Sequence, residues 1–218
     1  MFSLLKKDLV ACFKIDLKTI IKVLAGMFLI SIILMPSVLT PYSAVTMTFF
    51  ISYIFIFRSF YLDELNKCDY FLNSLPIEKE DIVYSKYLFA VFVIIISLLF
   101  SYCYSIVAEN IWGYANFDMD IVLMILILIL ILISISFPLN FKYGYRKSYI
   151  ILNLIIAAIV VFGIYGGSSV QSYIIGEWEE VPILRDKTLI IKFILSIIMY
   201  LISMYISKKI YDKKEIAG

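Results

Sequence analysis

The sequence predicts an all-α membrane protein with six transmembrane helices. Of its 218 residues, 63% are hydrophobic, and the mean hydropathy is +0.98. A water-soluble fold of this length cannot bury so much apolar surface. Long apolar runs also recur along the chain, and its length fits about six spans of roughly 20 residues. Between the second and third runs lies a polar segment, Tyr61–Tyr87, that is too long and too patterned for a simple turn.

The composition excludes several classes of chemistry. The chain has no histidine, which removes histidine acid–base catalysis, histidine-ligated zinc and the Ser-His-Asp triad. It also lacks a GxxxxGK[ST] loop for binding ATP itself. Three widely separated cysteines fit neither a disulfide framework nor a metal site. A net charge of +2, spread along the chain, argues against nucleic acid as a partner. We therefore expect no catalytic residues, no metal and no cofactor in this chain.

The N-terminal residues 1–19 predict an amphipathic helix that lies in the membrane interface. Apolar residues recur there at helical spacing, with lysines and aspartates on other faces. The apolar positions are Phe2, Leu5, Leu9, Phe13 and Leu17. The same residues could instead serve only as a basic flank that orients the first span, and both interpretations can hold together.

Hydropathy divides the rest of the single domain, residues 1–218, into spans and connections. The predicted spans are Ile20–Leu39, Ser43–Phe60, Leu88–Ala108, Ile121–Leu139, Tyr149–Gly166 and Leu189–Ser207. Residues 20–60 thus hold the first two spans, 61–87 the polar segment, 88–139 the next two spans, 140–148 a basic loop, 149–166 and 189–207 the last spans, and 208–218 a lysine-rich tail. Residues 167–188 form the longest opposite-side connection, and their apolar first half could re-enter the membrane.

The basic residues predict the orientation. Six spans place both termini on one side of the membrane. Sixteen of the nineteen lysines and arginines fall on that side, in the N-terminus, the polar segment with Arg58, the 140–148 loop and the tail. The positive-inside rule therefore assigns the termini and the polar segment to the cytosol, in a plasma membrane that we expect to be bacterial.

The predicted span cores carry no ionisable side chain, which argues against an ion-coupled transporter. Such a transporter needs groups within its spans that bind and release the ion. Lys22, Arg58, Glu109 and Lys192 all lie near span ends. Any transport would therefore take its energy from outside the membrane. A charge-free surface suits an amphipathic peptide or a hydrophobic compound better than an ion or a sugar.

The polar segment alternates apolar and charged residues, a pattern that suits packing against another protein. Pro76 stands near the start of a second helical piece, and acidic residues follow in its first turn, where the helix dipole favours them. The residues alone leave two interpretations open: a docking element, or a solvated amphipathic linker.

The stretch NSLPIEKEDIVYSKYL, between the second and third spans, resembles the pattern of small ABC-2 type transporter permeases. In that pattern SLP is followed by charged residues and then by I-V-x-x-K-Y. The resemblance extends to the basic N-terminal helix, the six spans and the longer connection before the last span. It implies the six-helix half of an ABCG-like, type V exporter that works as a homo- or heterodimer of permease subunits.

The resemblance also implies a partner and a set of contact residues. The N-terminal helix becomes a connector, and residues 61–87 become a coupling segment that contacts a separate ATP-binding subunit, which would hold the ATP and magnesium. The implied coupling residues are Asp63, Glu64, Asn73, Ser74, Leu75, Pro76, Glu78, Lys79, Glu80, Asp81 and Lys86. The alternative is a membrane immunity or sensor protein that transports nothing and binds its partner through the same segment.

Overall fold

The computed structural model describes residues 2–14, 40–68, 72, 74, 78–112, 119–154 and 182–213. Every regular element in these ranges is a helix and none is a strand, which confirms the all-α prediction. The predicted first span, 20–39, lies outside the described residues. So do most of the fifth span, 149–166, and most of the connection 167–188. The number of six spans therefore stays a prediction.

The described helices keep most of the predicted order but run further than the predicted spans. Their bounds are α1 Phe2–Lys14, α3 Thr40–Leu65, α5 Lys79–Trp112, α6 Met119–Tyr143 and α8 Pro182–Asp212, with a further helix at 145–154. For example, α5 begins at Lys79, whereas hydropathy places the third span from Leu88. Hydropathy reports only the part suited to hydrocarbon, while backbone hydrogen bonds continue the helix beyond it.

Within the described residues, three helices are long and apolar enough to cross a membrane. These stretches are Lys79–Ile106, Val122–Tyr143 and Thr188–Asp212. Their outward side chains are large and apolar, as at Leu99 of α5 and Ile191 of α8, which are about 60% exposed. Such a surface needs lipid around it. The protein is therefore a membrane protein.

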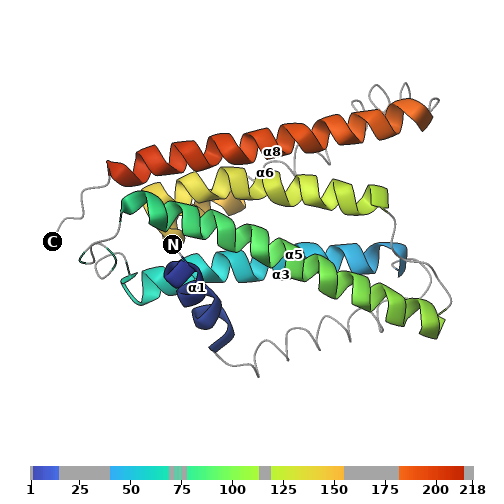
Figure 1. The fold of residues 1–218 in the computed structure, drawn as a ribbon, viewed down its shortest axis with the longest axis horizontal. Coiled ribbons are helices and arrows are strands. Elements are labelled where there is room, and N and C mark those ends of the chain that lie inside the picture. Colours follow the sequence, from blue (N-terminus) through green and yellow to red (C-terminus); the bar gives the residue numbers. More distant parts are fainter. Residues whose placement is uncertain are drawn as a thin grey trace.

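The long helices form a bundle with α1 lying across one end of it (Figure 1). Helix α3 packs along α5, α6 packs along α8, and the two pairs meet through α5·α8 and α3·α6 contacts. Helix α1 contacts both α3 and α5. It lies where α3 ends and α5 begins, near the last turns of α8 (Figure 1). We call this end of the bundle, opposite to Trp112 and Met119, the loop end.

A single glycine, Gly144, separates α6 from the next helix. Gly144 has a φ of 78°, in the left-handed region that favours glycine, and its N–H donates to the carbonyl of Asn140 at 3.0 Å. The chain then resumes as helix 145–154, with the N–H of Ser148 on the carbonyl of Gly144. The predicted loop 140–148 is thus mostly helical, broken only at Gly144.

Aromatic rings fill the interior toward the loop end. Phe137 of α6 makes edge-to-face contacts with Phe60 of α3 and Tyr87 of α5, at centroid distances of 4.9 and 4.7 Å. Tyr87 also meets Tyr200 of α8 at 5.1 Å. Lipid tails are as apolar as these side chains, so close packing rather than exclusion of water holds them together. One contiguous cluster thereby joins all four long helices.

A proline in α6 creates a hydrogen bond between helices. Pro138 has no N–H, so the carbonyl four residues earlier, on Ser134, loses its partner within the helix. The hydroxyl of Ser203 in α8 donates to that carbonyl at 2.8 Å. A hydrogen bond from α8 thus replaces the one that α6 lacks, and the carbonyl is not left unpaired within the membrane.

Ser203→Ala should lower the free energy of unfolding by about 1–2 kcal/mol, because it leaves the Ser134 carbonyl unpaired and also removes the hydrogen bond between Ser203 and the Tyr87 hydroxyl. Ser196→Ala is the matched control. Ser196 is equally buried in α8, but its hydroxyl bonds only to the carbonyl of Phe193 in its own helix. Unfolding titrations in mixed detergent micelles measure both variants, and equal losses would contradict this account.

Candidate functional site

Three helices meet around one buried ammonium group at the loop end. Lys86, in the second turn of α5, is 3% exposed. Its Nζ donates to Oδ1 of Asp8 at 2.9 Å and to Oγ of Ser59 at 2.5 Å, and it also contacts Oδ2 of Asp63. Asp8 belongs to α1, and Ser59 and Asp63 belong to α3. All three donor positions of the ammonium are therefore used.

A second lysine balances the charge of this cluster. Nζ of Lys7 lies 2.9 Å from Oδ1 of Asp63 and 3.3 Å from Oδ1 of Asp8. Two carboxylates thus face two ammonium groups. Burial raises the pKa of Asp63, but the Lys86 and Lys7 ammonium groups outweigh it and hold that pKa below its ordinary value. Asp63 therefore stays ionised at neutral pH, and the cluster fastens α1 to the ends of α3 and α5.

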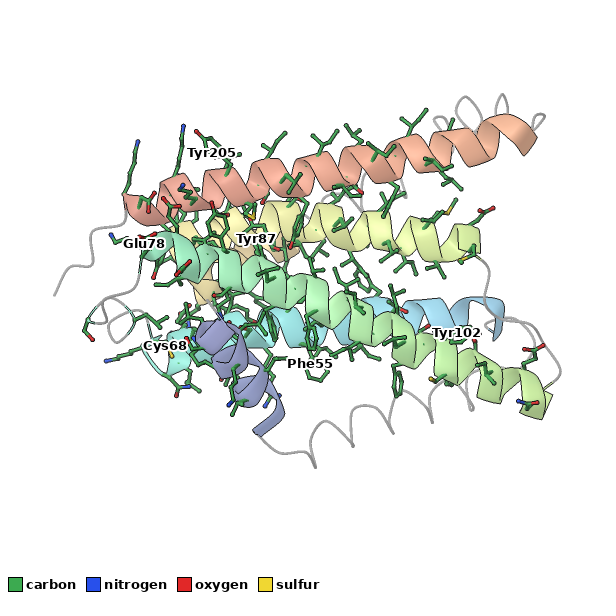
Figure 2. The ribbon with its side chains drawn as sticks, viewed as in Figure 1. Phe55, Cys68, Glu78, Tyr87, Tyr102 and Tyr205 are labelled. Atoms are coloured by element: carbon green, nitrogen blue, oxygen red, sulfur yellow. The ribbon has the colours of Figure 1, made fainter. Side chains whose placement is uncertain are left out.

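The next residue of α5 fastens the opposite side of the bundle. The hydroxyl of Tyr87 shares hydrogen bonds with Ser203 at 2.7 Å and Ser207 at 2.8 Å, both in α8. The hydroxyl of Tyr200 donates to the backbone carbonyl of Tyr87 at 2.7 Å. Figure 2 shows Tyr87 in the interior of the bundle. Lys86 and Tyr87, adjacent in sequence, therefore join α5 to α1 and α3 and to α8, respectively.

The end of α3 also holds the turn after α6. Oε2 of Glu64 accepts a hydrogen bond from the N–H of Arg146 at 3.0 Å. This N–H belongs to the first turn of helix 145–154, where a helix has unpaired donors and attracts negative charge. A Cβ at position 144 would lie 3.2 Å from the same oxygen, so the glycine leaves room for Glu64. Glu64 thereby caps a helix that follows it by eighty residues.

The start of α5 makes two further contacts with the end of α8. Lys208 pairs with Glu80 at 2.7 Å, and Lys79 donates to the backbone carbonyl of Asp212 at 3.4 Å. Both contacts are at least partly exposed, so each contributes little energy by itself. They extend the link between α5 and α8 beyond the buried Tyr87.

The predicted coupling residues fall into three groups. Asn73, Leu75 and Pro76 lie outside the described residues. The side-chain bonds described above involve Asp63, Glu64, Lys79, Glu80 and Lys86. The third group is described by its exposure: Ser74 and Glu78 are exposed and Asp81 is half-buried. Figure 2 shows Glu78 at the loop end of the bundle. Their contact with an ATP-binding partner stays a prediction.

The sequence analysis did not identify two of the groups that complete the site. Asp8 is 2% exposed, although it lies among lysines in a helix expected to sit at a membrane surface. Among residues 3–10 of α1, whose burial the structure describes, the buried ones are Leu4 and Asp8, one turn apart, while Leu5 and Leu9 of the expected stripe are half-buried. The serines at 203 and 207 were also missed. Their spacing of four, one helix turn, is the signal that a single face holds both.

The described residues contain no group of three or more metal-ligating side chains.

A family model described as "ABC-2 family transporter protein" matches residues 3–212. The chain belongs to the ABC-2 transporter family. Comparisons with curated proteins and with solved structures gave no match. This ABC-2 protein is thus the membrane component of an ABC transporter, and catalysis is not its own task. Membership also implies association with an ABC ATP-binding subunit.

Lys86→Met in this ABC-2 protein should lower the free energy of unfolding by about 3–5 kcal/mol, because it leaves two carboxylates buried with one remaining ammonium group. Adding Asp8→Asn should restore part of the loss. Lys208→Met serves as the control, since its exposed pair with Glu80 contributes little to stability. Micelle unfolding titrations would refute the buried cluster if both lysine variants lost the same amount.

Cys68 reports on the same cluster. Burial raises the pKa of the Cys68 thiol, and the neighbouring Asp63 carboxylate raises it further. Asp63→Asn removes the carboxylate, so the thiolate fraction near pH 8 should rise and alkylation should accelerate severalfold. The measurement uses chains with Cys12 and Cys103 replaced by serine. Glu78→Gln is the matched control, and an unchanged rate in Asp63→Asn would show that the carboxylate is not beside the thiol.

Proposed function

We propose that this ABC-2 family protein is the permease subunit of an ATP-driven exporter and that residues 61–87 couple it to the ATP-binding subunit. One observation supports the coupling role above others. The segment is continuous with α3 and α5, and its charged residues bond at the loop end to α1, to helix 145–154 and to α8. Asp63 and Lys86 hold α1, Glu64 holds the turn at 144, and Glu80 contacts α8.

In this mechanism the ATP-binding subunit pushes on the segment, and the bonds at the loop end spread the displacement. Lys86 is buried and Asp63 is half-buried against it, so we assign both to positioning and not to direct contact with the partner. Glu78 is exposed and stands immediately before α5, which makes it available to a partner. A push there would move α5 as a rigid lever and would carry α1, α3 and α8 with it.

The partner subunits, the orientation in the membrane and the cargo complete the proposed function. ATP and magnesium belong to the partner subunit, and a second permease subunit, identical or different, completes the pathway. The loop end and the termini face the cytosol, as the distribution of basic residues favours. The described spans carry ionisable residues only near their ends. This supports an amphipathic peptide or a hydrophobic compound as cargo, moved outward from the cytosol.

Glu78→Lys should reduce co-purification of the ATP-binding subunit severalfold, because it reverses a charge on the surface proposed to meet the partner. Glu109→Lys is the matched control. It is the same exchange at an exposed position near the far end of α5, whereas Glu78 immediately precedes the start of that helix. The two variants are compared by pull-down of the tagged permease after co-expression, with ATPase activity of the captured complex as a second readout.

Equal capture by wild type and Glu78→Lys, with loss in Glu109→Lys, would place the partner at the wrong end and refute the proposal. Failure of the wild type to capture any ATPase would favour the immunity or sensor function instead. For the positioning residues, Asp63→Asn should leave capture intact while reducing the ATPase response to the permease.

A further inference from the structure

A cavity of about 150 Å³ lies at the loop end, between α3, α5, α6 and the last turn of α8. Part of its wall is aromatic, with Phe60, Phe141 and Tyr211 contributed by three different helices. These rings also contact one another, Phe141 at 5.6 Å from Phe60 and 5.5 Å from Tyr211 between centroids. The packing therefore holds the space open with a fixed apolar wall.

The same wall contains an amide whose nitrogen has no partner among the described residues. Asn140 of α6 is 5% exposed, and its Nδ2 makes no hydrogen bond with any described residue. Nearly all buried polar side chains in native proteins have a partner, and an unpaired one costs about 1–3 kcal/mol. Because Asn140 lines the cavity, its donor is available to an acceptor on an occupant.

The charges on the wall favour a cation. Two carboxylates, Asp63 and Glu64, and one ammonium group, Lys86, line the cavity. Lys86 and Asp63 already satisfy one another within the buried cluster. Glu64 uses one oxygen for the N–H of Arg146, and its second oxygen makes no hydrogen bond with the described residues. One carboxylate oxygen is therefore available beside the aromatic wall, where organic cations are stabilised.

The cavity also lies at a defined height in the membrane. Its wall includes Ile82, Tyr143 and Tyr211, which stand at the ends of the three candidate spans. The ends of transmembrane helices coincide with the layer of lipid headgroups, where tyrosine is common. A molecule bound here can therefore reach the cavity from the lipid headgroup layer or from the adjoining water.

We propose that this cavity binds a small primary ammonium compound of the ethanolamine type. The ammonium donates to Glu64, the oxygen two carbons away accepts from Asn140, and the carbons between them rest on the rings of Phe60 and Phe141. Since a water molecule occupies roughly 30 Å³ in the liquid, the volume admits only a few heavy atoms. The compound can be a free amine or the headgroup of a phosphatidylethanolamine lipid.

Thermal unfolding of the full chain in detergent tests this directly. Lysophosphatidylethanolamine should raise the midpoint by about 2–4 °C, whereas lysophosphatidylglycerol of the same acyl chain should not. A separate sample with free ethanolamine distinguishes the two sources. A rise with free ethanolamine assigns the site to the amine alone, and a rise only with the lysolipid assigns it to the lipid headgroup. No rise with either ammonium compound would overturn the proposal.

Two cavity variants locate the effect. Glu64→Gln and Asn140→Leu should each abolish the rise, while Glu78→Gln, which changes an exposed carboxylate outside the cavity wall, should retain it. If the rise persists in both cavity variants, the binding site lies elsewhere and the proposal is wrong.

Native mass spectrometry of the wild-type chain gives a readout that does not depend on the variants folding. With equal amounts of both lysolipids present, the ethanolamine form should be retained preferentially. Equal retention would contradict the proposed recognition of the ammonium group. This experiment needs no ATP-binding subunit, so its failure would leave the proposed permease function intact.

Discussion

The ammonium group of Lys86 is the constraint on which the loop end depends. A buried charge without partners costs several kcal/mol, and Lys86 is only 3% exposed, so solvent cannot take the place of those partners. Asp8, Asp63 and Ser59 supply the partners from two other helices. Helix α1 must therefore lie where it does, across the ends of α3 and α5. An arrangement that moves α1 away takes Asp8 from Lys86 and Lys7 from Asp63, so each of these two groups loses a charged partner.

Adjacent positions on a helix point about 100° apart, and α5 uses this geometry to hold two neighbours at once. Lys86 faces the ionic cluster, and Tyr87 faces the hydroxyl groups of Ser203 and Ser207. The two sets of bonds differ in character: one is charged and joins α1 and α3, the other is neutral and joins α8. In the proposed mechanism α5 therefore cannot move at the loop end without moving its neighbours on both sides.

The cavity adjoins the charged set of bonds, because Asp63 and Lys86 line it. Its wall combines groups already satisfied, such as Lys86, with groups that are not, such as the amide of Asn140. An occupant would touch α3, α6 and α8 together, so its binding would depend on how far these helix ends stand apart. The proposed amine site would thereby connect the composition of the surrounding headgroup layer with the arrangement of the loop end.

The sequence by itself determined the all-α membrane class, because hydropathy reports directly which segments suit hydrocarbon. It also identified the polar segment and, through NSLPIEKEDIVYSKYL, the ABC-2 family. Only the tertiary structure decided how the charges of that segment are used. Asp8 and Lys86 are 78 positions apart, and Tyr87 and Ser203 are 116 apart. Helical spacing in the sequence cannot predict contacts between residues so far apart, because these residues meet only when the helices pack together. In the sequence, Lys86 follows several acidic residues and suggests a solvated surface. Only the packed helices show that its ammonium group is buried.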